Sequence, residues 1–324
     1  MTRQKHKVHK RAKQPLFPYF CKFYMTVEAI FNVKMCRKIL FSTIILITLL
    51  ASLSTCHNAN AWSNGGFSSD PSNPDYGTHD WIAHHALNWL LDAEKQFILE
   101  NLAAYLYGTE LPDNGQAPEG IGDTAKHHVY YFANGSLQDD ASAIRAQQEY
   151  EAAAAYYRSG DLANAAKRLG VMSHYIVDVA VFAHVMGAET DWGSENKTIH
   201  TNYENYVNGR TNNYTDEFNA FLIFDGVLNE ISAYNATLML AYDTTFDVDG
   251  DLTCVWMNQN YNWSDPTFRN RCGESLNLAV NFLADVLHTF YMQEVIPEFN
   301  PAHLLLLFLM ITILIAVFYV KKKA

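Results

Sequence analysis

The sequence predicts an all-α protein built around one multi-helix domain. Apolar residues recur at helical spacing through most of the chain from Trp62 to Val295, and no segment shows the convincing alternation of a strand. The 324 residues are 49% hydrophobic and 18% charged, which is enough to bury a sizeable core and argues against disorder. We therefore expect one helical domain over residues 62–295, with targeting segments over residues 1–61 and 296–324.

The first 61 residues have the pattern of a signal peptide. A basic stretch is followed by the apolar run Ile39–Leu53 and by the small residues Ala59-Asn60-Ala61. An A-x-A site of this kind predicts cleavage before Trp62 and export of the rest of the chain, although an uncleaved membrane anchor is the alternative. The basic extension is long for a leader, so Met25 or Met35 is an alternative start.

The exported part begins with an irregular arm and continues as helices. Residues 62–77 are rich in Ser, Asn, Asp, Gly and Pro, which is typical of a loop. Helical periodicity follows in six segments: His79–Leu106, Ala141–Arg158, Leu162–Met186, Thr201–Asn208, Glu217–Tyr242 and Glu274–Val295. Three loops are expected between them, over Gly108–Asp123, Gly187–Thr198 and Asp243–Cys272.

The C-terminal end predicts a transmembrane helix with a sorting signal. His303–Val320 is a continuous apolar segment of spanning length, closed by the basic residues Lys321–Lys323. Directly before it, Pro297-Glu298-Phe299 resembles the motif of archaeal PEF-type sorting signals, whose tails are cleaved and replaced by an anchor. The resemblance implies an archaeal cell-surface location and processing by an archaeosortase-type enzyme.

Charge and cysteine content are consistent with an extracellular protein. Ten of the 23 basic residues precede Trp62 and three more close the chain, whereas 33 of the 34 acidic residues lie after Trp62. The strongly acidic exported part disfavours nucleic-acid binding and favours solubility or a cation-rich site. Its two cysteines, Cys254 and Cys272, are suited to one disulfide in an oxidising compartment.

Two pairs of side chains have the spacing of metal ligands. His174 and Asp178 stand four residues apart in a predicted helix, so both leave the same face one turn apart and can bind one ion. His200 and Glu204 repeat this spacing after the loop, and His184 lies between the pairs. Imidazole nitrogen with carboxylate oxygen is a ligand set that zinc favours.

Other residues extend this inventory, and spacing alone does not choose among them. His79 opens the first predicted helix, Asp113 lies in the following loop, and His127-His128 comes just after that loop. The competitors for these roles are Asp80, His84, His85, Asp123 and His127.

The segments that carry these ligand pairs resemble those of the zinc-dependent bacterial phospholipases C, a family that includes the catalytic domain of clostridial alpha-toxin. His174-Tyr175-Ile176-Val177-Asp178, followed by His184, carries part of the resemblance. The segment His200–Val207 carries the rest, because it is similar to the family's H-x-x-Y-E-N-x-V stretch. The family departs from this chain in having Gly at the position of Val177 and Pro at the position of Phe182.

The resemblance implies three zinc ions and nine ligands. One zinc is held by Asp113, His128, His174 and Asp178; a second by His184, His200 and Glu204; a third by Trp62, through its amine and carbonyl, with His79 and Asp178. The choices between Asp113 and Asp123 and between His128 and His127 stay open. Because the third ion needs a free amine at Trp62, cleavage after Ala61 also activates the enzyme.

The implied activity is hydrolysis of a phosphodiester, with Asp113 orienting or deprotonating the attacking water. We expect the substrate to be a phospholipid, cut to a neutral lipid and a phosphorylated headgroup. One alternative is a zinc hydrolase like the fungal single-strand nucleases, which share the His/Asp ligands but end the ligand series with Asp where this chain has Glu204. The other is a non-catalytic surface or metal-storage protein that keeps the helical scaffold.

Overall fold

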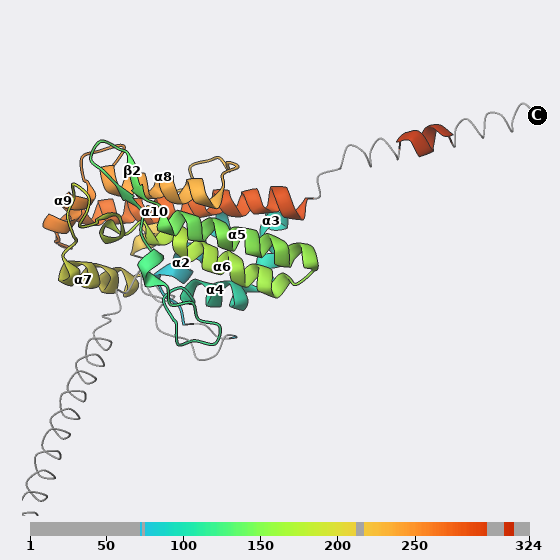
Figure 1. Ribbon diagram of the computed structural model, residues 1–324, viewed down its shortest axis with the longest axis horizontal. Helices are drawn as coiled ribbons and strands as arrows, with labels where there is room; N and C mark the ends of the chain where they lie inside the picture. The colour runs from blue at the N-terminus through green and yellow to red at the C-terminus, as the bar shows by residue number, and fades with distance from the viewer. Residues whose placement is uncertain (1–71, 73–74, 212–216, 297–307, 314–324) are drawn as a thin grey trace, which may run out of the picture. The chain divides into compact units, whose positions relative to one another are not determined.

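The computed structural model describes residue 72 and residues 75–211, 217–296 and 308–313. The chain divides into two compact units, Met1–Asn58 and Ala59–Ala324, and every described residue belongs to the second. This described part is mostly helical, as the sequence predicts (Figure 1).

Several predictions concern residues outside the described part, and these stay predictions. The signal peptide, Trp62 and the motif Pro297–Phe299 all lie there. Of the apolar segment His303–Val320, only residues 308–313 are described, and they are helical. Within the described ranges, no helix combines the length and the apolar character needed to cross a membrane.

Three short helices replace the single helix predicted from His79 to Leu106. They are α2 (Thr78–Trp89), α3 (Asp92–Leu99) and α4 (Leu102–Glu110). The chain is extended at Leu90 and Leu91, which separates α2 from α3. Leu90 is nevertheless buried, so the apolar pattern continues across the break and conceals it.

The next two helices form an antiparallel pair, α5 (Ala141–Ser159) and α6 (Leu162–Asp178). Gly160 ends α5 with a φ of 84°, the left-handed conformation that glycine adopts most readily. Asp161 then caps α6, because its side chain accepts a hydrogen bond of 3.2 Å from the backbone N–H of Asn164.

Helix α6 is the central helix of the described part. It packs against α2, α4, α5, α8 and α10, and Figure 1 shows it between α4 and α5. The contact with α4 is close, because a Cβ atom at Gly108 would overlap the backbone of Lys167, and one at Gly170 would overlap the backbone of Tyr105. Two glycines therefore let α4 and α6 approach each other, which positions the end of α6.

The remaining helices lie in the second half of the chain. They are η2 (Phe182–Val185), α7 (Lys197–Asn208), η3 (Phe218–Phe221), α8 (Ala233–Phe246), α9 (Cys254–Gln259), α10 (Pro266–Phe290) and the π-helical turn η4 (Tyr291–Val295). Helix α10 starts eight residues before the predicted Glu274, because Asp265 caps it and Pro266 occupies its first turn.

The predicted helix Glu217–Tyr242 is wrong over its first half. Residues 222–231 instead run in a non-helical conformation along α10. Their backbone N–H groups donate to α10 side chains, for example Ile223 to Asn277, Asn229 to Asp285 and Ile231 to Thr289, each at 2.8 Å. Polar side chains of another helix thus take the place of helical hydrogen bonds, a tertiary effect that local periodicity does not show.

A short antiparallel hairpin, β1 (Tyr130–Tyr131) with β2 (Leu137–Asp139), is the one sheet among the described residues. The 3₁₀ turn η1 (Thr124–Lys126) precedes it. Strands of two and three residues are too short to show alternation, so the sequence did not predict them.

The predicted disulfide between Cys254 and Cys272 is wrong, since both are buried free thiols. The segment Asp243–Cys272, in which the disulfide was predicted, is instead held by Arg271, a buried residue of α10. Its Nη2 donates to the side chain of Asp243 at 3.0 Å, and its Nε lies 3.6 Å from Asp247.

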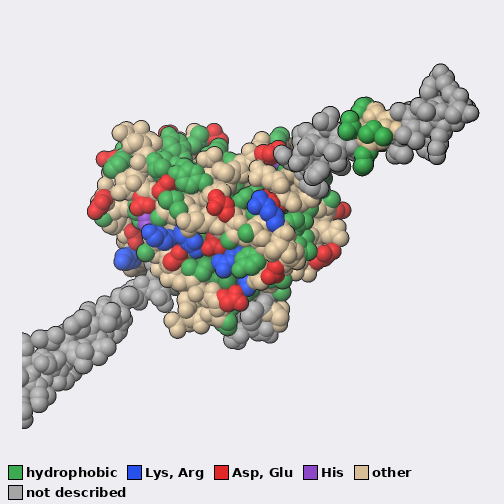
Figure 2. Space-filling model, turned by 45° about the vertical axis from the view of Figure 1, so that its right-hand side comes forward, with side chains coloured by type: hydrophobic (Ala, Val, Ile, Leu, Met, Phe, Trp, Pro, Cys, Tyr) green, Lys and Arg blue, Asp and Glu red, His purple; other side chains and the backbone are tan. Residues whose placement is uncertain are grey.

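Figure 2 shows acidic, basic and apolar side chains interspersed over the visible face.

Candidate metal centre

The last turn of α6 places His174 and Asp178 on one face of the central helix, and both are fully buried. The Nδ1 of His174 donates a hydrogen bond of 2.7 Å to the backbone carbonyl of Thr109 at the end of α4. Because Nδ1 carries the proton, Nε2 keeps its lone pair and is available as a metal ligand.

A first group of ligand atoms forms around Nε2 of His174. The Nδ1 of His127 lies 3.3 Å from this atom and 3.1 Å from Oδ2 of Asp178. Asp113 adds Oδ1 at 3.3 Å from His127 and at 3.8 Å from His174. Four side chains from α6 and from the loop after α4 therefore converge, two with nitrogen and two with oxygen atoms.

His79 lies against this group from α2. Its ring stacks on that of His174 with 3.9 Å between the centroids, and its Nε2 is 3.6 Å from Oδ1 of Asp178. Among the described residues neither ring nitrogen of His79 has a hydrogen-bond partner, although the side chain is fully buried. Burying an imidazole without a hydrogen-bond partner lowers the stability of the fold, unless a ligand such as a metal ion binds one of its nitrogens.

A second group consists of His184 on η2 with His200 and Glu204 on α7. The two Nε2 atoms are 3.1 Å apart, and Oε1 of Glu204 lies 2.8 Å from His200 and 3.6 Å from His184. The cap of α7 is Asn196, whose side chain accepts from the backbone N–H groups of Thr198 and Ile199. This cap fixes the start of the helix that carries both ligands.

The structure therefore brings eight of the candidate residues into three groups of possible ligands, two of which share His174. These are His79 with Asp113 and His174, His127 with His174 and Asp178, and His184 with His200 and Glu204. Seven of the nine predicted ligands belong to these groups together with His127, and the predicted ligand Trp62 lies outside the described residues.

His128 is not in these groups. His127 occupies the position beside His174 and Asp178 that the family resemblance assigns to His128. The ring of His127, just after the η1 turn, faces His174 and Asp178, whereas His128 has other contacts. The ring of His128 stacks on Tyr130 at 4.3 Å, and its Nε2 lies 3.3 Å from Asp139. Asp113, by contrast, lies in the groups where it was expected, and its competitor Asp123 does not.

The other competitors also have identifiable contacts. Asp80 accepts from the backbone N–H of Gly77 at 3.0 Å and from the hydroxyl of Thr109 at 2.9 Å, so it caps α2. Nδ1 of His84 is 3.2 Å from the hydroxyl of Tyr76, and Nδ1 of His85 is 3.2 Å from Asn88. These contacts lie outside the ligand groups.

The electrostatics favour the metal-binding form at three imidazoles and at Asp178. Burial lowers the pKa of His79 well below its usual range, and it also lowers the pKa of His174 and of His200. Neutral imidazole is the form that binds a metal. Burial alone would raise the pKa of Asp178, but His184 and His127 hold that pKa well below its usual range, so the carboxylate stays charged.

At His127, burial is outweighed by the carboxylates of Asp113, Asp123 and Asp178, which raise the pKa well above its usual range. Burial raises the pKa of Glu204.

A small pocket of about 110 Å³ opens onto these histidines. Its lining comprises Thr124, His127, His128, Tyr130, Ala183, His184, Glu195 and His200. Tyr130, Glu195 and the carbonyl of Thr109 were not singled out from the sequence. No sequence signal marks a pocket wall or a backbone acceptor, because both depend on how loops and helix ends meet.

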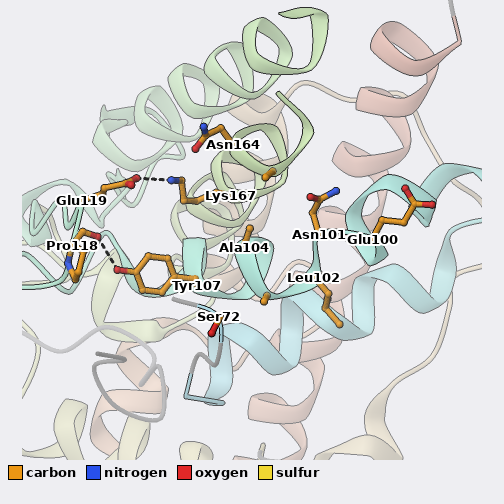
Figure 3. Close-up of a pocket in the computed structure, with 12 residues that line it drawn as sticks. Ser72, Glu100, Asn101, Leu102, Ala104, Tyr107, Pro118, Glu119, Asn164 and Lys167 are labelled. Carbon is orange, nitrogen blue, oxygen red and sulfur yellow. Dashed lines mark hydrogen bonds and ion pairs between the residues drawn. The ribbon is translucent and has the colours of Figure 1, made fainter. Parts of the chain in front are cut away.

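A larger hollow of about 450 Å³ lies elsewhere, between α4, the following loop and α6 (Figure 3). Lys167 and Glu119 form an ion pair on one side of it, and the Tyr107 hydroxyl donates to the carbonyl of Pro118. None of the candidate ligands lines this hollow, so size alone does not identify the site.

Comparison with known proteins gives a family match and remote structural likenesses, among them two to clostridial alpha-toxins. No curated protein matches the chain. The alpha toxin of Clostridium absonum is 15% identical, with a TM-score of 0.47, and the alpha-toxin of an avian strain of Clostridium perfringens is 13% identical, with a TM-score of 0.43. In both cases the match covers 71% of this chain and 66% of the toxin, so the chain spans just under two thirds of their length.

The family match is the stronger finding. A family model described as zinc dependent phospholipase C matches residues 78–246, which is more than half of the chain. The matched range contains every ligand group described above. The chain belongs to the zinc-dependent phospholipase C family.

Proposed function

We propose that this chain is an exported zinc-dependent phosphodiesterase that hydrolyses a phospholipid to a neutral lipid and a phosphorylated headgroup. The observation that carries the proposal is the convergence of eight buried or nearly buried His, Asp and Glu side chains within one part of the fold. Family membership supports the same class of reaction.

We assign the ligands as follows. Asp113, His127, His174 and Asp178 hold one ion, and His184, His200 and Glu204 hold a second. His79 and Asp178, together with the amine and carbonyl of Trp62, hold a third. This assignment keeps the set expected from the family resemblance but replaces His128 by His127, because only His127 faces His174 and Asp178.

Zinc in such a site supplies positive charge for the phosphate oxygens and lowers the pKa of a water from about 15.7 towards about 7. The chain's own contribution begins with Asp113, whose side chain is 9% exposed, whereas that of Asp178 is fully buried. Asp113 is thus the ligand-group carboxylate with the most access to solvent, and we assign it to orient the attacking water and accept its proton. The bond that breaks joins phosphorus to the glycerol oxygen.

The pocket beside the histidines supports a substrate with a compact polar end. A volume of about 110 Å³ suits a phosphorylated headgroup and excludes long acyl chains, so the lipid chains would lie outside it. Tyr130 and Glu195 form part of its wall and contact whatever group extends from the phosphate.

The proposals on export rest on the sequence. Residues 1–61 are proposed as a signal peptide, 62–295 as the catalytic domain and 296–324 as the sorting segment with its membrane helix and basic tail. This organisation would place the enzyme on the outer face of the cell membrane and in contact with lipid. Processing by an archaeosortase-type enzyme follows only from the motif Pro297–Phe299.

The test compares wild type with Asp113→Asn in phospholipid vesicles, with zinc content measured in the same samples. We expect wild type to release phosphorylated headgroup and the variant to lose at least about 100-fold in rate, the lower range for general acid–base catalysis. Asp92→Asn is the matched control, because the Asp92 side chain is fully exposed on α3. Hydrolysis of single-stranded DNA instead of lipid would favour the nuclease alternative, and zinc binding without any hydrolysis would favour the non-catalytic one.

A further inference from the structure

The ring of His127 has two different neighbours on its two nitrogens. Nδ1 faces the ligand groups, whereas Nε2 points away from them and lies 3.6 Å from Oδ1 of Asp123. A histidine that binds a metal through one nitrogen depends on the partner of the other nitrogen for its tautomer and orientation. Asp123 is the carboxylate in that position for His127.

Asp123 is itself held at both oxygens. Oδ1 accepts a hydrogen bond of 2.5 Å from the hydroxyl of Tyr175, and Oδ2 accepts one of 3.0 Å from Nε of Arg145. The backbone N–H of Asp123 donates to the carbonyl of Pro112 at 3.1 Å. The carboxylate therefore has a defined position on a segment without regular structure.

The two groups that hold Asp123 are anchored in turn. Tyr175 follows His174 on α6 and is fully buried. Arg145 on α5 donates to the same tyrosine hydroxyl at 3.2 Å, and its guanidinium lies 4.9 Å from the tyrosine ring centroid. Nη2 of Arg145 also donates to Glu149 at 2.7 Å. The position of Asp123 thus depends on the two central helices rather than on its own loop.

We propose that Asp123, held by Arg145 and Tyr175, is a positioning residue that fixes His127 with Nδ1 toward the metal. This inference rests on the proposed zinc site. It gives a function to an acidic residue whose spacing alone made it a candidate ligand. In the zinc-loaded protein the carboxylate would accept the Nε2 proton by closing a contact that is 3.6 Å in this structure, and this would leave the Nδ1 lone pair free for the ion and make the ring a better donor.

The test measures zinc affinity by chelator competition in wild type and in Asp123→Asn, which keeps the shape of the side chain and removes its charge. We expect an affinity loss of about 10- to 100-fold for the weakened ion, the usual effect of such partners. A histidine-selective ¹H–¹⁵N spectrum of the zinc-loaded protein should show the Nε2 proton of His127 in wild type. That signal should move or exchange away in the variant.

Lys167→Gln is the matched control. Lys167 also lies on α6 and forms an ion pair with Glu119, which is an exposed residue away from the ligands. We expect unchanged zinc affinity in this variant. The melting temperature of metal-free protein is measured for every variant, because a purely structural role of Asp123 would lower that temperature and leave zinc affinity intact.

Two results separate failure of this inference from failure of the proposed function. No zinc binding by wild type would remove the metal site itself. Zinc binding of equal strength in wild type and in Asp123→Asn would overturn the positioning role alone. If Asp123→Asn does not fold, Tyr175→Phe decides, because it removes only one of the two groups that hold Asp123; unchanged affinity in that variant would overturn the inference.

Discussion

The Nδ1 of His184 lies 2.9 Å from Oδ2 of Asp178, and this contact joins the ligand group that contains Asp178 to the ligand group that contains His184. The same carboxylate oxygen is 3.1 Å from Nδ1 of His127. Asp178 is fully buried at the last residue of α6, so the central helix of the fold ends at the point where the two groups meet. A carboxylate shared in this way couples the binding of neighbouring ions.

Asp178→Asn should therefore remove more zinc than any other single ligand substitution. We expect loss of at least two ions, because the carboxylate belongs to two of the assigned sites. Glu204→Gln, which affects one group, should lose one ion. The measurement is zinc content per chain by elemental analysis. Equal losses in the two variants would contradict the shared position of Asp178.

The choice between neighbouring histidines gives a second prediction. His127→Ala should lower zinc affinity by about 10-fold or more. The substitution removes a metal ligand, and even the loss of a residue that only hydrogen-bonds to a ligand usually lowers metal affinity by about 10-fold. His128→Ala should keep wild-type affinity, since His128 contacts Tyr130 and Asp139 instead. Chelator competition measures both. Stronger loss in His128→Ala would restore the ligand set expected from the sequence.

Close packing of α4 against α6 gives a third prediction, on stability. Gly170→Ala should destabilise the fold by about 1–3 kcal/mol, the usual cost of overpacking, because the new methyl group overlaps the backbone of Tyr105. Gly209→Ala is the control, since a methyl group there meets its neighbours only at ordinary contact distances of 3.5 Å and more. Urea denaturation compares the two variants, and equal free energies of unfolding would refute the close approach.

The free thiols give a fourth prediction. Burial raises the pKa of Cys254 and of Cys272 to about 12, so both are protonated at neutral pH. We expect neither to react with iodoacetamide in the native protein and both to react after denaturation without a reducing agent. Peptide mapping by mass spectrometry measures this. A peptide pair linked through these two residues would reinstate the disulfide.

Residue types and their spacing were sufficient to predict that several of the candidate side chains lie close together. His174 with Asp178 and His200 with Glu204 each lie one helical turn apart, and a helix converts that spacing into a shared face without outside help. His127 and His128 could not be separated in this way. Their directions depend on the segment between η1 and β1, where His128 accepts a backbone hydrogen bond from Ser142 and Val129 donates one to His184.

The helices of the fold were also predictable where local sequence signals determine them. Helices α5 and α6 carry their own boundaries, in Gly160 and in the cap Asp161. The apolar pattern of residues 222–231 predicts a helix, but side chains of α10 bind the backbone of this segment instead. Local pattern predicts what a segment can form, and partners distant in sequence decide what it does form.

The most direct test of the proposed zinc centre is zinc analysis of protein that begins at Trp62, combined with a chromogenic phosphodiester assay on the same sample. A variant with one additional residue before Trp62 serves as the comparison, because it lacks a free amine at that position. We expect about three zinc ions per chain in the first protein, and loss of one ion and of most activity in the second. Absence of zinc from both proteins would contradict the proposed centre.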